Sequence, residues 1–411
     1  MDTIPCPAHP VRTQPAGGRC ATPSGRAAGV RATPAPGGRT RITGLDLARG
    51  LAVLGMFAAH VGVTEELTWA PSSWSAVVHG RSAALFAVLA GVSIGLLSGG
   101  VRPSTGHALV RARVRIMVRA AWVFVIGGVL EFLGTDVAVI LSYYAALFFL
   151  ALPFLRWSPD HLLLLSAGLA VATPPTALVL ARLAVAADVE TPFTALLLNG
   201  EYPALWWWTF VLVGLALARL DLADGRVRVS LFVAGTAAAV TGYLLGWLST
   251  QLLADGVPSP GLEQGYEDPG TWDPAWLSGA QPHSGTPFWL LASAGVAVAA
   301  IAVCLVVADA LPRLIHPVAS VGAMALTVYS LQVVALWALP PETSPGTAWV
   351  LLSAGAVASS VAWRRVAGRG PLERLLAWSS DRAARAIDGG ERTGEFDPPD
   401  VALRSRTRTP R

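Results

Sequence analysis

The chain has 411 residues, of which 53% are hydrophobic and only 14% are charged, and its mean hydropathy is +0.54. Globular soluble proteins carry about 25% charged residues, so this composition places the chain in a lipid bilayer. Its net charge of +4 comes from arginine, because the sequence contains no lysine. We interpret that bias as base composition, and we expect no nucleic-acid partner.

The three cysteines, Cys6, Cys20 and Cys304, form no close pair and no metal-binding spacing, so we expect no disulfide framework and no metal site. Residues 1–40 are rich in Pro, Gly and Arg and lack the apolar core of a signal peptide. Residues 380–411 are polar in the same way. We expect both ends to be disordered, the second as a cytoplasmic tail, and residues 41–379 to form the membrane domain.

Ten apolar runs between these ends are long enough to cross a hydrocarbon layer of ~30 Å as helices. The sequence therefore predicts an all-α, polytopic integral membrane bundle. The predicted spans are 43–63, 80–98, 115–133, 137–155, 161–184, 203–220, 228–252, 287–308, 318–339 and 346–366.

Arginines predict the orientation of this bundle, because the cytoplasmic flanks of membrane spans retain positive charge. If both termini are cytoplasmic, only Arg81 and Arg182 of the 30 basic residues fall on the outer side, whereas acidic residues dominate the outer loops. Both termini are therefore expected inside, in a multi-pass protein of the cell membrane.

Polar residues line one face of the first predicted span, "RITGLDLARGLAVLGMFAAH". Asp46, Arg49 and His60 share this face through spacings of three and four residues. Asp46 and Arg49 either form an interfacial ion pair or help to hold an anionic cofactor that enters from the cytoplasm. His60 lies roughly 16 Å further along the helix. Because an imidazole in lipid is costly, it is either a functional group facing the bundle or a hydrogen-bonded structural histidine.

Five segments, in this order, resemble a known family. The first two spans, "RITGLDLARGLAVLGMFAAH" and "HGRSAALFAVLAGVSIGL", resemble the opening of membrane acyltransferases of the heparan-alpha-glucosaminide N-acetyltransferase type and of the related bacterial domain-of-unknown-function 418 proteins. "GEYPALWWWTFVLVGLALARLDL" resembles their tyrosine-proline turn and following helix, and "HPVASVGAMALTVYSLQVV" resembles a later helix with tyrosine and glutamine. "GPLERLLAW" resembles their closing motif.

The resemblance implies an enzyme that takes an acetyl group from cytoplasmic acetyl-CoA and delivers it across the bilayer to a sugar amine or hydroxyl, or to a small amine. The animal enzyme has its proposed catalytic histidine in the loop after the first span. Here that loop has His79 only at its far end, so the base is either His60 or His79. A metabolite transporter and a non-catalytic membrane protein remain alternatives, and a homodimer is one candidate for the oligomeric state.

Candidate site residues follow from these expectations. For acyl transfer we expect His60, His79 and Arg81 to supply the general base and a charge for the acceptor or the oxyanion; Arg81 is alternatively an interfacial anchor. Phosphates of coenzyme A suit arginines, and the candidates for binding it are Asp46, Arg49, Arg111, Arg113 and Arg115, although positive flanks also follow from orientation alone.

The candidates for binding the acceptor are Glu201, Tyr202, Tyr329 and Gln332. Tyr329 and Gln332 share one side of a helix and alternatively bond between helices. Trp206–Trp208 follow Tyr202 and are typical of a belt at the membrane interface. Glu131 either orients a histidine or lies among the lipid headgroups.

Overall fold

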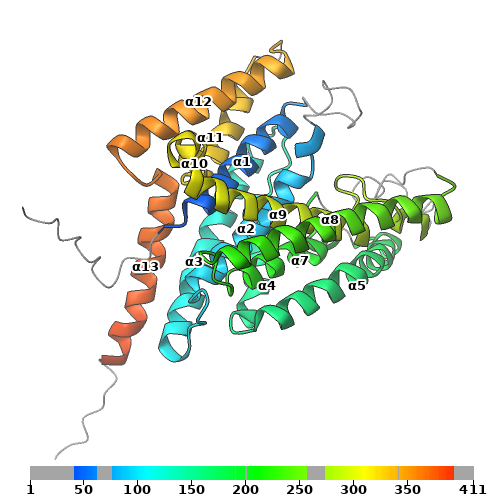
Figure 1. Ribbon diagram of the computed structural model, residues 1–411, viewed down its shortest axis with the longest axis horizontal. Coiled ribbons are helices and arrows are strands. Elements are labelled where there is room, and N and C mark those ends of the chain that lie inside the picture. The colour runs from blue at the N-terminus through cyan, green and yellow to red at the C-terminus, as the bar shows by residue number, and fades with distance from the viewer. Residues whose placement is uncertain are drawn as a thin grey trace, which may run out of the picture. The chain divides into compact units, whose positions relative to one another are not determined.

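The computed structural model describes residues 41–62, 76–189, 191–199, 201–256, 274–340 and 342–392. All regular elements within these ranges are helical (Figure 1). The long helices are α1 (Thr43–His60), α2 (Arg81–Leu97), α3 (Gly106–Glu131), α4 (Leu141–Ala151), α5 (Pro159–Ala186), α7 (Ala204–Leu217), α8 (Gly225–Leu253), α9 (Pro287–Ala310), α10 (Pro312–Gly322), α11 (Ala325–Ala338), α12 (Pro345–Val366) and α13 (Pro371–Arg392). Short elements are η2 (Leu152–Phe154), α6 (Pro192–Thr194), η3 (Ala195–Asn199) and η5 (Pro274–Leu277).

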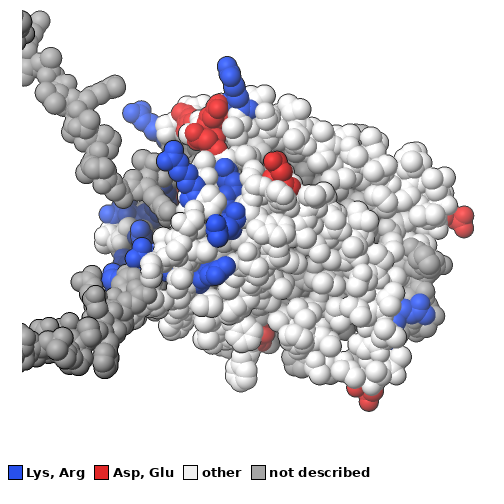
Figure 2. Space-filling model, turned by 90° about the horizontal axis from the view of Figure 1, so that it is seen from below, with Lys and Arg blue, Asp and Glu red and all other residues white. Residues whose placement is uncertain are grey.

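Each of the ten predicted spans overlaps a helix, and the all-α membrane class is confirmed. In the described part of the chain, five helices are long and apolar enough to cross a membrane, or six if α10 and α11 together make one span. The segment Leu141–Phe154 and helix α7 are apolar but shorter. The number of ten spans therefore stays a prediction. Charged side chains gather toward one end of the face seen in Figure 2 and leave a broad surface without charge, as lipid contact requires.

The segment predicted as a span over 318–339 is bent. The chain leaves helical geometry at Met324, and α10 and α11 meet at an angle of 65°. Hydropathy reports how apolar a run is and not its direction, so it could not show the bend. The run is continuous in composition and broken in structure.

Residues 380–392 are helical, where the sequence analysis expects disorder. Helix α13 begins at Pro371, a residue favoured in the first turn of a helix, and it runs beside α3 (Figure 1). Its charges make the segment look like a polar tail, yet Asp381 pairs with Arg115 of α3 at 2.9 Å. Residues 1–40 and 393–411, for which disorder is also expected, lie outside the described residues.

Small residues let two pairs of helices approach to backbone contact. In the α1–α10 pair, a Cβ atom on Gly322 would overlap the carbonyl oxygen of Asp46, and one on Gly50 would overlap that of Val318. In the α2–α7 pair, Gly91 and Gly214 are equally crowded. Helices in a bilayer associate through such close packing, because lipid tails are as apolar as the side chains themselves.

Buried Arg219 fixes one end of the bundle. Its side chain is 6% exposed and donates hydrogen bonds to the carbonyl oxygens of Gly100 and Leu155 and to Ser98 Oγ. The guanidinium thereby joins the end of α7 to the end of α2 and to the turn after η2. Arginine suits this position because it presents five donors in a fixed arrangement.

The α1–α10 contact can be tested with Gly322→Ala. We expect a loss of unfolding free energy of about 1–3 kcal/mol, because the new methyl must displace the backbone of α1. The measurement is chemical or thermal unfolding in detergent. Gly355→Ala is the matched control, since a Cβ there meets no neighbour within 4 Å. Equal stability of the two variants would contradict the close packing.

Candidate active site

His60, at the last position of α1, faces α11. Its Nδ1 atom lies 3.1 Å from Gln332 Oε1 and 3.0 Å from Gln332 Nε2, so the amide binds either tautomer of the ring. The imidazole also meets the ring of Tyr329 edge to face, with centroids 6.0 Å apart. Gln332 is 2% exposed and Tyr329 is fully buried. The fold thus brings together three residues singled out from the sequence, inside the bundle.

The segment between α3 and α4 packs against Tyr329. The amide of Ile140 donates to the hydroxyl of Tyr329 at 3.4 Å. Ser142 Oγ donates at 2.7 Å to Oε1 of Glu131, which is exposed. This bond joins the end of α3 to the start of α4.

His79 stands beside a second histidine that the sequence analysis did not select. The imidazoles of His79 and His283 meet edge to face, with centroids 5.4 Å apart. The ring of His283 also lies within about 6 Å of the rings of Tyr202, Trp207 and Trp289. His283 adopts a positive φ of 60°, which is uncommon for any residue except glycine. Its only sequence signal is a histidine in a Pro- and Gly-rich loop before an apolar run.

Trp206 and Trp207 are core residues and not members of a belt at the membrane interface. Both are fully buried, and Trp207 packs against Tyr202, Phe210 and Trp289. The expectation of a belt is wrong for these two side chains, because α7 is surrounded by other helices. Glu201, in contrast, is exposed.

Tyr144 of α4 packs among aromatic side chains. Its ring stacks on those of Phe86 and Phe148, with centroids 5.6 Å and 6.5 Å apart. The side chain is 2% exposed, and among the described residues its hydroxyl has no hydrogen-bond partner. A buried hydroxyl normally has one. It is therefore available to water or to a bound polar molecule.

Helices α1 and α2 hold the two histidines at one end of the bundle. A Cβ on Gly55 would overlap Ser82 Oγ and would lie 3.3 Å from Val78 Cβ. His60 lies five residues beyond Gly55, about 7.5 Å along α1, and His79 directly follows Val78 in the turn before α2. The turn that carries His79 therefore packs against the same end of α1 that carries His60.

Arg81 contacts α8. Its Nε donates to the hydroxyl of Tyr243 at 2.6 Å, and its guanidinium lies 5.3 Å from the centre of that ring. Its Nη1 donates to the carbonyl oxygen of Val77 at 3.2 Å. These bonds fix Arg81 at the base of α2, two residues from His79.

Asp46 and Arg49 form the ion pair that is one of the two expected alternatives. Arg49 Nη1 lies 3.0 Å from Asp46 Oδ1, and Arg49 Nη2 donates to Ser93 Oγ of α2 at 2.9 Å. The Asp46 side chain is 4% exposed and that of Arg49 is 22% exposed. The pair is largely enclosed by protein, at the opposite end of α1 from His60.

Two arginines of α3 contact α13. Arg115 pairs with Asp381, and Arg119 Nε donates to Ser380 Oγ at 3.2 Å. Arg111 and Arg113 are half-buried. Of the four arginines expected to bind a cofactor, Arg115 is therefore held by α13 and Arg49 by Asp46.

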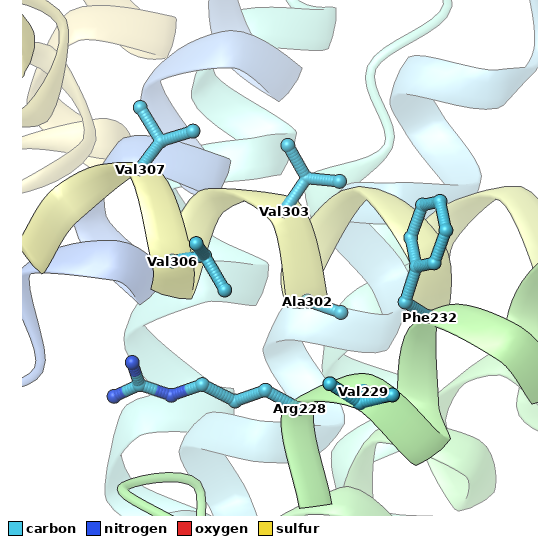
Figure 3. A pocket seen from close by; sticks show the side chains of 7 residues that line it. All are labelled: Arg228, Val229, Phe232, Ala302, Val303, Val306 and Val307. Carbon is cyan, nitrogen blue, oxygen red and sulfur yellow. The ribbon is translucent and has the colours of Figure 1, made fainter. Parts of the chain in front are cut away.

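Two hollows between α8 and α9 contain none of the predicted site residues. The hollow in Figure 3 is lined almost entirely by apolar side chains, with Arg228 along one edge. Arg228 is held there by Asp309 and by the carbonyl oxygen of Leu222. Such a surface suits lipid chains. The described residues also contain no group of three or more His, Cys, Asp or Glu placed to hold a metal ion.

Residues 41–250 match a protein-family model described as heparan-alpha-glucosaminide N-acetyltransferase, catalytic. The matched range includes His60, His79, Arg81, Glu131 and Tyr202. Helices α9 to α13, with Gln332 and Tyr329, follow it. A comparison with curated proteins gave no match.

The unpaired hydroxyl of Tyr144 can be compared with the paired hydroxyl of Tyr329. We expect Tyr144→Phe to leave the unfolding free energy of the substrate-free protein unchanged, because no protein hydrogen bond is lost. Tyr329→Phe should cost about 0.5–1.5 kcal/mol, since it leaves the amide of Ile140 unpaired. Unfolding in detergent measures both. A loss in Tyr144→Phe as large as that in Tyr329→Phe would show that the Tyr144 hydroxyl is already bonded.

Proposed function

Because the chain belongs to the heparan-alpha-glucosaminide N-acetyltransferase catalytic family, we propose that it is a membrane acetyltransferase that uses acetyl-CoA as donor. The acetyl group passes from the cytoplasmic side to an amine or hydroxyl on the other side, on a cell-envelope sugar or a small amine. The observation that carries this proposal is the contact of His60 with Gln332 and Tyr329 inside the bundle.

The contact with Gln332 makes His60 suited to act as a general base. When Gln332 Oε1 accepts the proton of Nδ1, the lone pair of the imidazole is on Nε2. The acceptor nitrogen or oxygen forms a bond to the thioester carbonyl carbon and gives up its proton to Nε2. The carbon–sulfur bond breaks, and the thiolate leaves and takes that proton. Products are the acetylated acceptor and free coenzyme A, and the imidazole returns to its starting state.

His79, His283 and Tyr202 are our candidates for the acceptor side. The ring of His283 lies between the other two, with its centroid 5.4 Å from that of His79 and 5.9 Å from that of Tyr202. Aromatic faces with polar edges suit a sugar or a small amine. Arg81 lies two residues from His79 and adds positive charge for the developing oxyanion, while exposed Glu201 attracts an amine. His79 also remains the alternative base.

The donor is expected at the opposite end of α1. Arg49, Arg111 and Arg113 are candidates for binding phosphates, because a guanidinium binds phosphate in a bidentate manner. Asp46, the ion-pair partner of Arg49, and Arg115, which pairs with Asp381, would orient this set. The thioester must then reach His60, roughly 16 Å from Arg49 along α1.

Acetyl transfer can be measured with purified protein in liposomes and labelled acetyl-CoA. We expect label to appear on an amine or sugar acceptor, and His60→Ala to lower the rate by about 10²–10⁴-fold, the usual effect of removing a general base. His161→Ala, at an exposed histidine bonded to Ser158, is the control and should keep the wild-type rate.

The outcomes separate the alternatives. A loss confined to His79→Ala would identify His79 as the base. Accumulation of an unmodified solute without acetylation would instead favour a transporter. Transporters often form their substrate sites from broken membrane helices, and the bent pair of α10 and α11 resembles such a helix.

We further propose ten spans in the cell membrane with both termini in the cytoplasm. Single cysteines at Asp136 and Asp221, introduced after Cys6, Cys20 and Cys304 are replaced by serine, test this arrangement. A membrane-impermeant maleimide added to intact cells should label Asp136→Cys, whereas Asp221→Cys should react only after permeabilisation. The reverse pattern would contradict the orientation.

A further inference from the structure

Helix α11 begins without a cap of its own. Its N-cap residue, Met324, makes no side-chain capping hydrogen bond. The first amides of a helix have no partner within the helix, and at α11 they lie at a bend inside the bundle. Another part of the chain must supply acceptors there.

Glu373 of α13 supplies those acceptors. Its Oε1 accepts from the amide of Thr327 at 3.1 Å, and its Oε2 accepts from the hydroxyl of Thr327 at 2.6 Å. The amide of Leu372 donates to the same hydroxyl oxygen at 3.2 Å. Thr327 is the third residue of α11 and is 4% exposed. A carboxylate at the start of a helix also gains from the positive end of the helix dipole.

The neighbouring residues make room for this bond. A Cβ on Gly370 would overlap Glu373 Oε2 and would lie 2.9 Å from Thr327 Oγ1. Pro371 opens α13, and the amide of Arg374 bonds to the carbonyl oxygen of Gly370. The segment "GPLE" is therefore a unit that presents one carboxylate to α11.

The same helix carries the partners of His60. Tyr329 and Gln332 lie two and five residues beyond Thr327, about 3 Å and 7.5 Å along α11. Because a helix is stiff over this distance, the position of Thr327 sets that of the Gln332 amide. Helix α13 is in turn held to α3 through Arg115–Asp381 and Arg119–Ser380.

We propose that Glu373 is a positioning residue for the reaction, which by capping α11 holds Gln332 and Tyr329 against His60. The inference rests on the proposed function, because it assigns the effect of Glu373 to His60. Glu373 itself touches neither the imidazole nor the reacting groups.

The test compares Glu373→Ala and Glu373→Gln with Arg385→Ala, an exposed residue of the same helix. We expect Glu373→Ala to lower kcat by about 10- to 100-fold, as a displacement of about 1 Å can, with KM for acetyl-CoA unchanged. Glu373→Gln keeps the side-chain length and one acceptor oxygen, and should restore most of the rate. Arg385→Ala should match wild type.

A double-mutant cycle tests the route of the effect. If Glu373 acts through Gln332, Glu373→Ala should add little to the loss caused by Gln332→Ala, because effects transmitted through one contact are not additive. Fully additive losses, or a raised KM with unchanged kcat, would overturn the proposal.

Hydrogen exchange provides a readout without turnover. Amides near Thr327 and those preceding His60 should both exchange faster in Glu373→Ala than in wild type or Arg385→Ala. Unchanged protection at both places would overturn the proposal, and so would a change confined to Thr327. If wild type transfers no acetyl group, the proposed function fails, while the exchange data still decide whether Glu373 holds α11 against α1.

Discussion

The contact between His60 of α1 and Gln332 of α11 is the interaction on which the site depends. It joins two residues that lie 272 positions apart in the chain, the last of α1 and one in the middle of α11. A histidine inside a membrane bundle needs such a partner, because an unsatisfied polar group in a low-dielectric interior is costly. The same bond occupies Nδ1 of the imidazole, and under the proposed function the other ring nitrogen, Nε2, takes the proton of the acceptor.

Polar groups occupy opposite ends of α1 for related reasons. Asp46 and Arg49 satisfy each other and Ser93 at one end, and His60 meets α11 at the other. Between them, Gly50 brings α1 into backbone contact with α10, and Gly55 lets the side chain of Ser82 of α2 approach closely. The small residues and the polar residues therefore act together, because close packing excludes lipid from the face on which the polar groups lie.

Much of the helical framework could be predicted, because a bilayer imposes long apolar runs and the sequence displays them. The shared face of Asp46, Arg49 and His60 also followed from helical periodicity alone. The bend at Met324 could not be predicted from hydropathy, since the contacts on either side of it, Gly322 against α1 and Thr327 with Glu373, are made by distant parts of the chain. The part of helix α13 beyond residue 380 was not predicted, because its many charged residues are typical of a disordered tail. The sequence does not show that one face of this helix packs against α3. His283 was missed because only the fold brings a loop histidine to His79.

The most direct measurement is the reactivity of His60 toward diethylpyrocarbonate, followed by mass spectrometry, with and without a non-transferable thioether analogue of acetyl-CoA. If His60 is reached by the donor, the analogue should slow modification of His60 while the exposed His161 reacts at an unchanged rate. Modification of His60 at the same rate in the presence of saturating analogue would contradict its place at the reacting centre.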